Sequence, residues 1–119
     1  MKIIISSSMK FRDLIKSTMA KLETLGHVPL FPNIDYNAGD KILTPKEKNE
    51  FAWDHYKAIE EADAVYFILP NGYMGTSCKI ELGYALAQKK PIYFSDPTND
   101  TDLDAYSKKF IPVDELNLF

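Results

Sequence analysis

The chain of 119 residues contains a single cysteine, Cys78, and therefore cannot form an internal disulfide. A lone thiol suits a reducing compartment, so we expect a cytoplasmic location. No apolar run approaches the roughly 20 residues that a membrane-spanning helix needs, and no signal segment is evident. The sequence thus predicts no association with a membrane.

An excess of positive charge is also missing. The chain has 14 Lys and Arg against 17 Asp and Glu, for a formal net charge of -3. The two Lys-Lys pairs, at 89–90 and 108–109, fall where helices are expected to end and can complement the helix dipole there. This composition disfavours binding to a nucleic-acid polymer, which needs a basic surface. A small nucleotide needs only one or two anion contacts and stays compatible.

Several familiar site motifs are absent. The chain has no G-x-G-x-x-G, no phosphate loop ending in G-K-[ST] and no G-x-S-x-G. Cys78, His27 and His55 do not have metal-ligand spacing. The first expected strand also lacks the acidic pair with which a receiver domain holds Mg²⁺. We therefore expect neither a metal nor a cofactor.

Short apolar, β-branched runs alternate with segments of helical periodicity. Strands are expected at 2–5, 27–31, 64–69 and 91–94, and helices at 10–25, 44–62 and 77–89. This alternation predicts a single α/β domain over residues 1–119, with a parallel sheet and helices on both faces.

Capping and turn residues refine this prediction. Gly26 should end the first helix, and Thr44-Pro45 should begin the second. Pro29 favours an edge position for its strand. Residues 32–43 should form a long loop with at most one helical turn. The tail after residue 96 is expected to contain a short helix and a last strand.

Glu81 is the position that carries most functional information. The buried run 64–69 leads into a turn with two glycines and then a helix, which places this turn in the crevice at the carboxyl edge of the sheet. If Ser77 is the N-cap, Glu81 is the fourth helical residue, one beyond the position that a capping box requires. The carboxylate can simply complement the helix dipole, worth about 0.3–1 kcal/mol. Alternatively, nearby backbone N–H groups keep it ionised as a nucleophile or an oxocarbenium stabiliser.

Other polar and aromatic residues have two interpretations each. Ser6 and Ser8 follow the first strand and can bind an anion or sugar hydroxyls, or merely cap the next helix. His55 shares the apolar face of the second helix, where it is either a half-buried structural residue or a proton donor to a leaving base. Asp54, a third of a turn away, suits a solvated charge better. Tyr73, and with it Phe11, can stack on a base or serve packing.

Taken together, these segments resemble the nucleoside 2-deoxyribosyltransferase-like superfamily, which includes nucleotide 5′-monophosphate N-hydrolases. The resemblance rests on Ala62-Asp63, on Gly72-Tyr73-Met74-Gly75-Thr76-Ser77, on Glu81-Leu82-Gly83-Tyr84-Ala85 and on Lys90-Pro91-Ile92-Tyr93. It implies a flavodoxin-like, doubly wound fold and N-glycosidic chemistry on a nucleoside or nucleotide. It also implies a homodimer or larger homo-oligomer, for which the aromatic tail ending at Phe119 is a candidate surface.

The resemblance assigns roles to individual residues. It makes Glu81 the nucleophile that forms a covalent glycosyl-enzyme, with His55 or Asp54 assisting the departing base. The residues implied in substrate binding are Ser6, Ser8, Phe11, Asn71, Gly72, Tyr73, Gly75, Thr76 and Ser77.

Two positions depart from the transferases of the superfamily. Gly75 and His55 stand where those enzymes carry aspartates, and the serine-rich first turn is more similar to the N-hydrolases. Hydrolysis and transfer both stay open. A nucleotide-sensing module without turnover is the alternative from another class, and a flavin-binding protein is a third.

Overall fold

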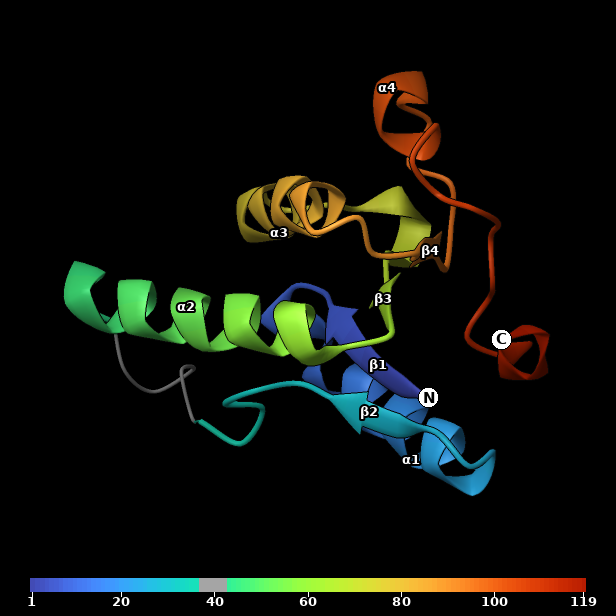
Figure 1. Cartoon of the computed structure of the whole chain (residues 1–119), viewed down its shortest axis with the longest axis horizontal. Helices are drawn as coiled ribbons and strands as arrows, with labels where there is room; N and C mark the ends of the chain where they lie inside the picture. Colours follow the sequence, from blue (N-terminus) through green and yellow to red (C-terminus); the bar gives the residue numbers. More distant parts are fainter. Residues whose placement is uncertain (37–42) are drawn as a thin grey trace.

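The computed structural model describes residues 1–36 and 43–119, in which four strands form one parallel sheet. The strands are β1 (Lys2–Ser6), β2 (Val28–Leu30), β3 (Ala64–Phe67) and β4 (Ile92–Phe94), in the order β2-β1-β3-β4 (Figure 1). From β1 the chain moves outward to β2, whereas from β3 it moves outward to β4 on the opposite side. The order therefore switches between β1 and β3, and the doubly wound fold is confirmed.

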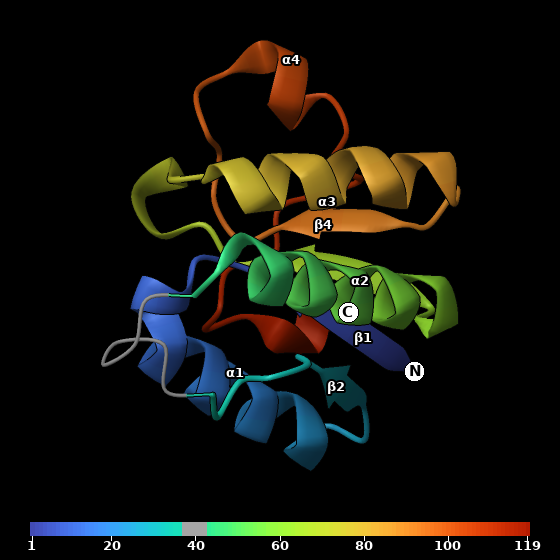
Figure 2. The same cartoon turned by 90° about the vertical axis from the view of Figure 1, so that its left-hand side faces the viewer.

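Alternate residues of the strands build a core on each face of the sheet. Ile4 belongs to the core beneath α2 (Pro45–Glu61) and α3 (Thr76–Ala87). Ile3 and Ile5 point to the opposite core, which α1 (Arg12–Thr24) covers. Figure 2 shows α2 and α3 side by side on one face, with α1 below them. The period of two in the strand side chains thus produces helices on both faces.

The expected helix ends are confirmed where capping chemistry is clear. Gly26 has φ 87°, and the N–H of Gly26 and of His27 donate to carbonyls of the last turn of α1, as in a Schellman motif. Thr44 and Glu47 form a reciprocal capping box at the start of α2, with Pro45 as the first helical residue. Edge strand β2 accommodates Pro29, as predicted.

Lys90 caps the C-terminal end of α2. Lys90 Nζ donates to the carbonyls of Glu60 and Ala62, both at 2.9 Å. A cation is favourable there because the last carbonyls of a helix lack intrahelical partners. The Lys-Pro-Ile segment therefore ties the start of β4 to the helix that carries His55.

Two expectations are wrong. The N-cap of α3 is Gly75 and not Ser77, so Glu81 lies in the second turn, beyond the strongest field of the helix N-terminus. In the described part of the chain, no strand follows β4. Instead Phe110 makes one isolated bridge to Phe94, and the helices α4 (Thr101–Asp104) and Leu116–Leu118 occupy the tail.

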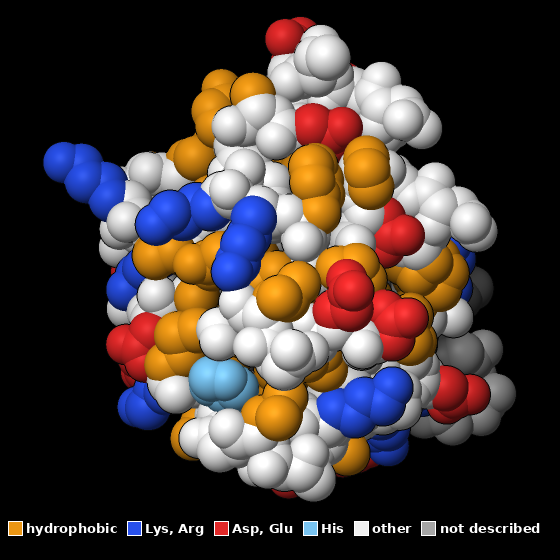
Figure 3. All heavy atoms as spheres, turned by 90° about the vertical axis from the view of Figure 1, so that its right-hand side faces the viewer, with side chains coloured by type: hydrophobic (Ala, Val, Ile, Leu, Met, Phe, Trp, Pro, Cys, Tyr) orange, Lys and Arg blue, Asp and Glu red, His pale blue; other side chains and the backbone are white. Residues whose placement is uncertain are grey.

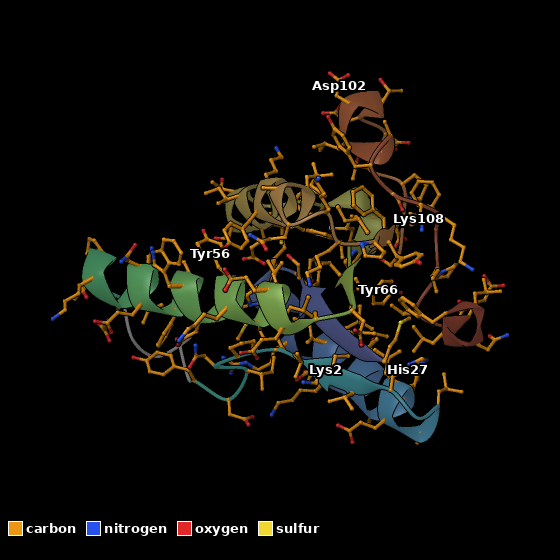
Figure 4. The ribbon with its side chains drawn as sticks, viewed as in Figure 1. Lys2, His27, Tyr56, Tyr66, Asp102 and Lys108 are labelled. Atoms are coloured by element: carbon orange, nitrogen blue, oxygen red, sulfur yellow. The ribbon has the colours of Figure 1, made fainter. Side chains whose placement is uncertain are left out.

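The apolar tail packs by ring contacts and not by strand pairing. The Phe119 ring lies 4.9 Å from that of Tyr66 and 5.3 Å from that of Tyr93, measured between centroids. The hydroxyl of Tyr66, a residue of β3 that is labelled in Figure 4, donates to the carbonyl of Ile111. Burial of these aromatic surfaces explains the alternating apolar pattern that suggested a strand.

The remaining features concern the loop after β2 and the surface. Residues 32–35 form a turn, and residues 37–42 of the expected loop lie outside the described residues. No described helix is both long enough and apolar enough to cross a membrane. The face shown in Figure 3 carries side chains of both charges interspersed with apolar ones.

Gly72 and Gly83 give a matched pair of stability predictions. At Gly72, φ is +77° and an added Cβ would lie 2.5 Å from the Pro97 carbonyl oxygen, whereas Gly83 in α3 has no atom within 4 Å of such a Cβ. We expect Gly72→Ala to destabilise the fold by roughly 1–3 kcal/mol and Gly83→Ala to stabilise it by up to about 1 kcal/mol. Urea unfolding measures both, and equal effects of the two substitutions would contradict this account.

Candidate functional site

A cleft of about 620 Å³ opens at the carboxyl edge of the sheet, near the switch between β1 and β3. Its walls come from the turn after β1, the segment after β2, one face of α2 and the first turns of α3. Both the position and the size are typical of a small-ligand site in an open α/β sheet.

Glu81 lies in the wall of this cleft with one oxygen held by two partners. The Ser6 hydroxyl donates to Glu81 Oε1 at 2.7 Å, and His55 Nε2 lies 3.0 Å from the same oxygen. The Glu81 side chain is only 13% exposed, and that of His55 is 8% exposed. No partner for Glu81 Oε2 is found among the described residues, so this oxygen is available to a ligand.

Local structure explains how the three side chains meet. Ser6 is the fully buried last residue of β1, at the edge where the cleft opens. His55 lies on the inner face of α2, together with the buried Ala58 and Ile59. Glu81 stands between the buried Cys78 and Leu82 on α3 and the solvent. These groups are 26 to 75 residues apart in the chain and come together only through the parallel sheet.

The His55 ring is held by packing more than by hydrogen bonding. The Phe31 ring meets it edge-on, with centroids 5.2 Å apart. Nε2 has no well-aligned hydrogen bond among the described residues, although Glu81 is within ion-pair distance. Buried polar atoms are normally hydrogen-bonded, so this nitrogen is a candidate for a hydrogen bond with a ligand.

Glu81 is the only carboxylate among the described residues that line the cleft. Two neighbouring acids stay neutral around pH 7. Burial raises the pKa of the Cys78 thiol to about 11, against a smaller opposing effect of a hydrogen bond with Ser6. Burial, and secondarily the charge of Glu81, raises the pKa of the Tyr56 phenol. Neither group therefore supplies an anion to the cleft at neutral pH.

Five further residues expected in the site line the cleft: Ser8, Tyr73, Gly75, Thr76 and Ser77. Thr76 and Ser77 are exposed in the first turn of α3, where backbone N–H groups lack intrahelical partners. The Lys10 ammonium lies 3.5 Å from the centroid of the Tyr73 ring. This end of the cleft therefore offers hydroxyls and backbone amides to a polar ligand, and Lys10 lies outside the lining, against Tyr73.

The other expected residues lie outside the lining, and their contact with substrate stays a prediction. Asn71 and Gly72 have φ of 55° and 77° and shape the turn after β3. Phe11 supports Tyr73 edge-on, with ring centroids 6.2 Å apart. Asp54 accepts a hydrogen bond from Asn33 Nδ2 at 3.1 Å on the exposed side of α2.

Ser7, Phe31 and Tyr56 are among the lining residues that were not predicted as site residues from the sequence. The Ser7 hydroxyl donates to the Ile68 carbonyl at 2.7 Å and joins the turns after β1 and β3. Tyr56 directly follows His55 on α2. Its place on the apolar face of the helix is equally typical of a core residue, so the sequence pattern alone did not identify it as part of a site. Phe31 directly follows β2, at the same carboxyl edge as Ser6.

Among residues 1–36 and 43–119, no group of three or more His, Cys, Asp or Glu is placed to hold a metal ion. The polar side chains that line the cleft include a carboxylate, an imidazole and several hydroxyls. A carboxylate can act as a nucleophile at an electrophilic carbon, and an imidazole can give a proton to a leaving group.

Comparison with protein families gives the class of the chain. The model of the nucleoside 2-deoxyribosyltransferase family matches residues 7–111, so the chain belongs to this family. Family membership supports glycosyl transfer or cleavage as the general chemistry. No curated protein sequence matches the chain.

Solved structures share the fold. The 2-deoxyribosyltransferase of Bacillus psychrosaccharolyticus has a TM-score of 0.79 at 18% identity, with 100% of this chain and 92% of that chain covered. The CMP N-glycosidase BcmB of Clostridium botulinum has a TM-score of 0.61 at 18% identity, with 100% of both chains covered. A conserved protein of Enterococcus faecalis V583 has a TM-score of 0.64 at 10% identity, with 98% and 97% covered.

Burial of Cys78 predicts a slow thiol. At pH 8 we expect the native protein to react with a thiol-specific reagent roughly 100-fold or more slowly than the urea-unfolded chain, because the thiolate is scarce and shielded. Stopped-flow absorbance with an aromatic disulfide measures both rates. Equal rates in the native and unfolded protein would show that Cys78 is accessible and that the wall around Glu81 is looser than described.

Proposed function

We propose that this protein cleaves or exchanges the N-glycosidic bond of a (deoxy)ribonucleoside or its 5′-monophosphate, with Glu81 as the nucleophile. The observation that carries the proposal is the pairing of Glu81 Oε1 with Ser6 and His55, which leaves Oε2 unpartnered beside the cleft. A nucleophilic carboxylate must be ionised, oriented and open to the reacting carbon on one side.

The reaction has two displacement steps. Oε2 of Glu81 forms a bond to C1′ of the sugar while the C1′–N bond breaks, and the bonding electron pair leaves with the base. The product is a glycosyl ester of Glu81. Water or a second base then attacks C1′, the ester bond breaks, and the carboxylate is restored with net retention at C1′.

His55 is proposed to assist the leaving base. Its Nε2 lies beside the nucleophile, at the wall of the cleft, where it can give a proton or hydrogen bond to a base nitrogen. Asp54, the other candidate, is bound to Asn33 on the exposed side of α2 and fits this role less well.

Ser6 is better placed to orient Glu81 than to bind substrate. It is fully buried behind the carboxylate, and its hydroxyl is committed to Oε1. As Oε2 becomes the ester oxygen, Oε1 becomes the carbonyl oxygen and can keep this hydrogen bond. Sugar hydroxyls or a phosphate would then be bound by Ser8, Thr76 and Ser77.

The rival is a nucleotide-sensing module that binds without turnover. Gly75 favours it, because superfamily transferases have an acid at this position. A Cβ at Gly75 would lie 3.4 Å from the Tyr73 hydroxyl, so Tyr73 already covers this part of the wall. Tight nucleotide binding without release of free base would select this rival.

Substitution of Glu81 tests the proposal. We expect Glu81→Ala to abolish release of free base while ligand binding persists, since the cleft is otherwise intact. Ser6→Ala should lower kcat by roughly 10–100-fold, the value of one hydrogen bond to a charged group. Chromatography of a nucleoside and monophosphate panel measures both.

Asp54→Ala is the matched control, since it removes a carboxylate near the site that does not line the cleft. It should retain most of the activity. Undiminished turnover by Glu81→Ala would refute the assignment of the nucleophile.

We also propose that the chain forms a homodimer, through the outer face of α3 and not through the tail. Ile80, which also lines the rim of the cleft, is 55% exposed on α3, and Trp53 on the adjoining α2 is 54% exposed. Lys79, Ile80 and Gly83 are all exposed on α3, so a second copy can pack against this helix across a two-fold axis.

Light scattering tests this interface. We expect the unaltered protein to be a dimer and Ile80→Lys to be monomeric, because a buried lysine without a partner opposes association. Leu25→Lys, at a residue that is 48% exposed at the end of α1, is the control and should stay dimeric. A monomeric parent protein would contradict the proposal.

A further inference from the structure

The proposed chemistry needs a fixed separation between two helices. His55 is on α2 and Glu81 is on α3, and their side chains meet at 3.0 Å. The helices lie side by side on one face of the sheet (Figure 2). A relative shift of about 1 Å between such groups can cost on the order of 100-fold in rate.

The buried side of the α2–α3 contact is apolar. α2 contributes Ala58 and Ile59 to the shared core, and α3 contributes Cys78, Leu82 and Ala85. Apolar packing sets how closely the two helices approach, whereas a hydrogen bond or a ring stack also fixes their alignment. A contact of this directional kind is present on their outer side.

Tyr84 supplies that contact on the outer side of the two helices. Its ring stacks on Tyr56 with centroids 5.0 Å apart and an interplanar angle of 27°. Its hydroxyl donates to Glu60 Oε1 at 2.6 Å, and this hydrogen bond is the main reason that the pKa of Tyr84 is raised. Among the described residues, this stack is the only ring contact between α2 and α3.

The contact lies within one helical turn of each reacting group in the sequence. Tyr84 is three residues after Glu81 on α3, whereas Tyr56 is next to His55 on α2. Figure 4 shows Tyr56 on the side of α2 that faces α3, and its ring is itself part of the cleft wall. Trp53 packs edge-on against Tyr56, with centroids 5.1 Å apart, and braces the ring from the other side.

We propose that Tyr84 is a positioning residue that holds α3 against α2 and thereby sets the separation of Glu81 and His55. The contact of Tyr84 with Tyr56 and Glu60 is called the clasp below. Tyr84 is not part of the cleft lining, so it acts through Tyr56 and Glu60 and not through contact with substrate. This inference rests on the proposed function for its catalytic consequence, but the clasp itself is a property of the protein without ligand.

The test compares variants that remove parts of the clasp. Tyr84→Phe keeps the stack and loses the hydrogen bond, Tyr84→Leu loses both, and Glu60→Gln keeps an acceptor for the hydroxyl. Tyr106→Leu, at a tyrosine that is 50% exposed and outside both helices, is the control. Each protein is assayed for kcat and KM, and the His55 ring signals are recorded by NMR beside those of Glu81→Gln.

We expect Tyr84→Leu to lower kcat at least 10-fold with less than a threefold change in KM. Its His55 ring signals should move towards those of Glu81→Gln, because the carboxylate recedes from the imidazole. Tyr84→Phe should show a smaller effect of the same kind, and Glu60→Gln and Tyr106→Leu should resemble the parent.

The ring signals separate this inference from the proposed function. If a folded Tyr84→Leu has the parent's His55 signals and kcat, the clasp is refuted. If the parent releases no base but the signals still move in Tyr84→Leu, the proposed function fails and the clasp stands.

Discussion

The hydrogen bond from Ser6 to Glu81 is the interaction on which the site depends. A carboxylate that is mostly withdrawn from water loses hydration and must be compensated by protein groups. The Ser6 hydroxyl provides this compensation by donating to Oε1, and the His55 imidazole lies 3.0 Å from the same oxygen. Because both partners use the same oxygen, the arrangement stabilises the carboxylate and still leaves Oε2 exposed to the cleft.

The sheet makes this arrangement possible. β1 and β3 are neighbours from which the chain leaves in opposite directions, so the turns after them diverge and leave a crevice. The Ser7 hydroxyl fastens the two turns by donating to the Ile68 carbonyl. α3 then enters the crevice with Glu81 in its second turn, near enough to Ser6 for direct contact and far enough inside to be shielded by α2.

Patterns local in sequence predicted much of this fold. Glycine and proline restrict or permit particular backbone conformations, and such restrictions can be recognised from a few neighbouring residues. The structure confirms the three predictions made in this way, at Gly26, at Thr44-Pro45 and at Pro29. The two errors also have physical reasons. Thr76 and Ser77 are both good capping residues, but the backbone is already helical at Thr76, so the N-cap is Gly75. Over residues 96–119 the tail forms no strand because its Phe119 ring packs against Tyr66 and Tyr93.

The site was only partly predictable. Glu81 could be selected because a strand, a glycine turn and a helix place it at the sheet edge. The part played by Ser6 could not, since its partner is 75 residues away and only the tertiary fold joins them. The same holds for Tyr84, whose contacts with Tyr56 and Glu60 cross between two helices.

The most direct test of the nucleophile is to trap its covalent intermediate. A 2′-fluoro-2′-deoxy nucleotide destabilises the oxocarbenium-like transition states and should slow resolution of the glycosyl ester. Intact-mass spectrometry followed by peptide mapping should then find one sugar, or sugar phosphate, on Glu81. Base release without any adduct, or an adduct on another residue, would contradict the account.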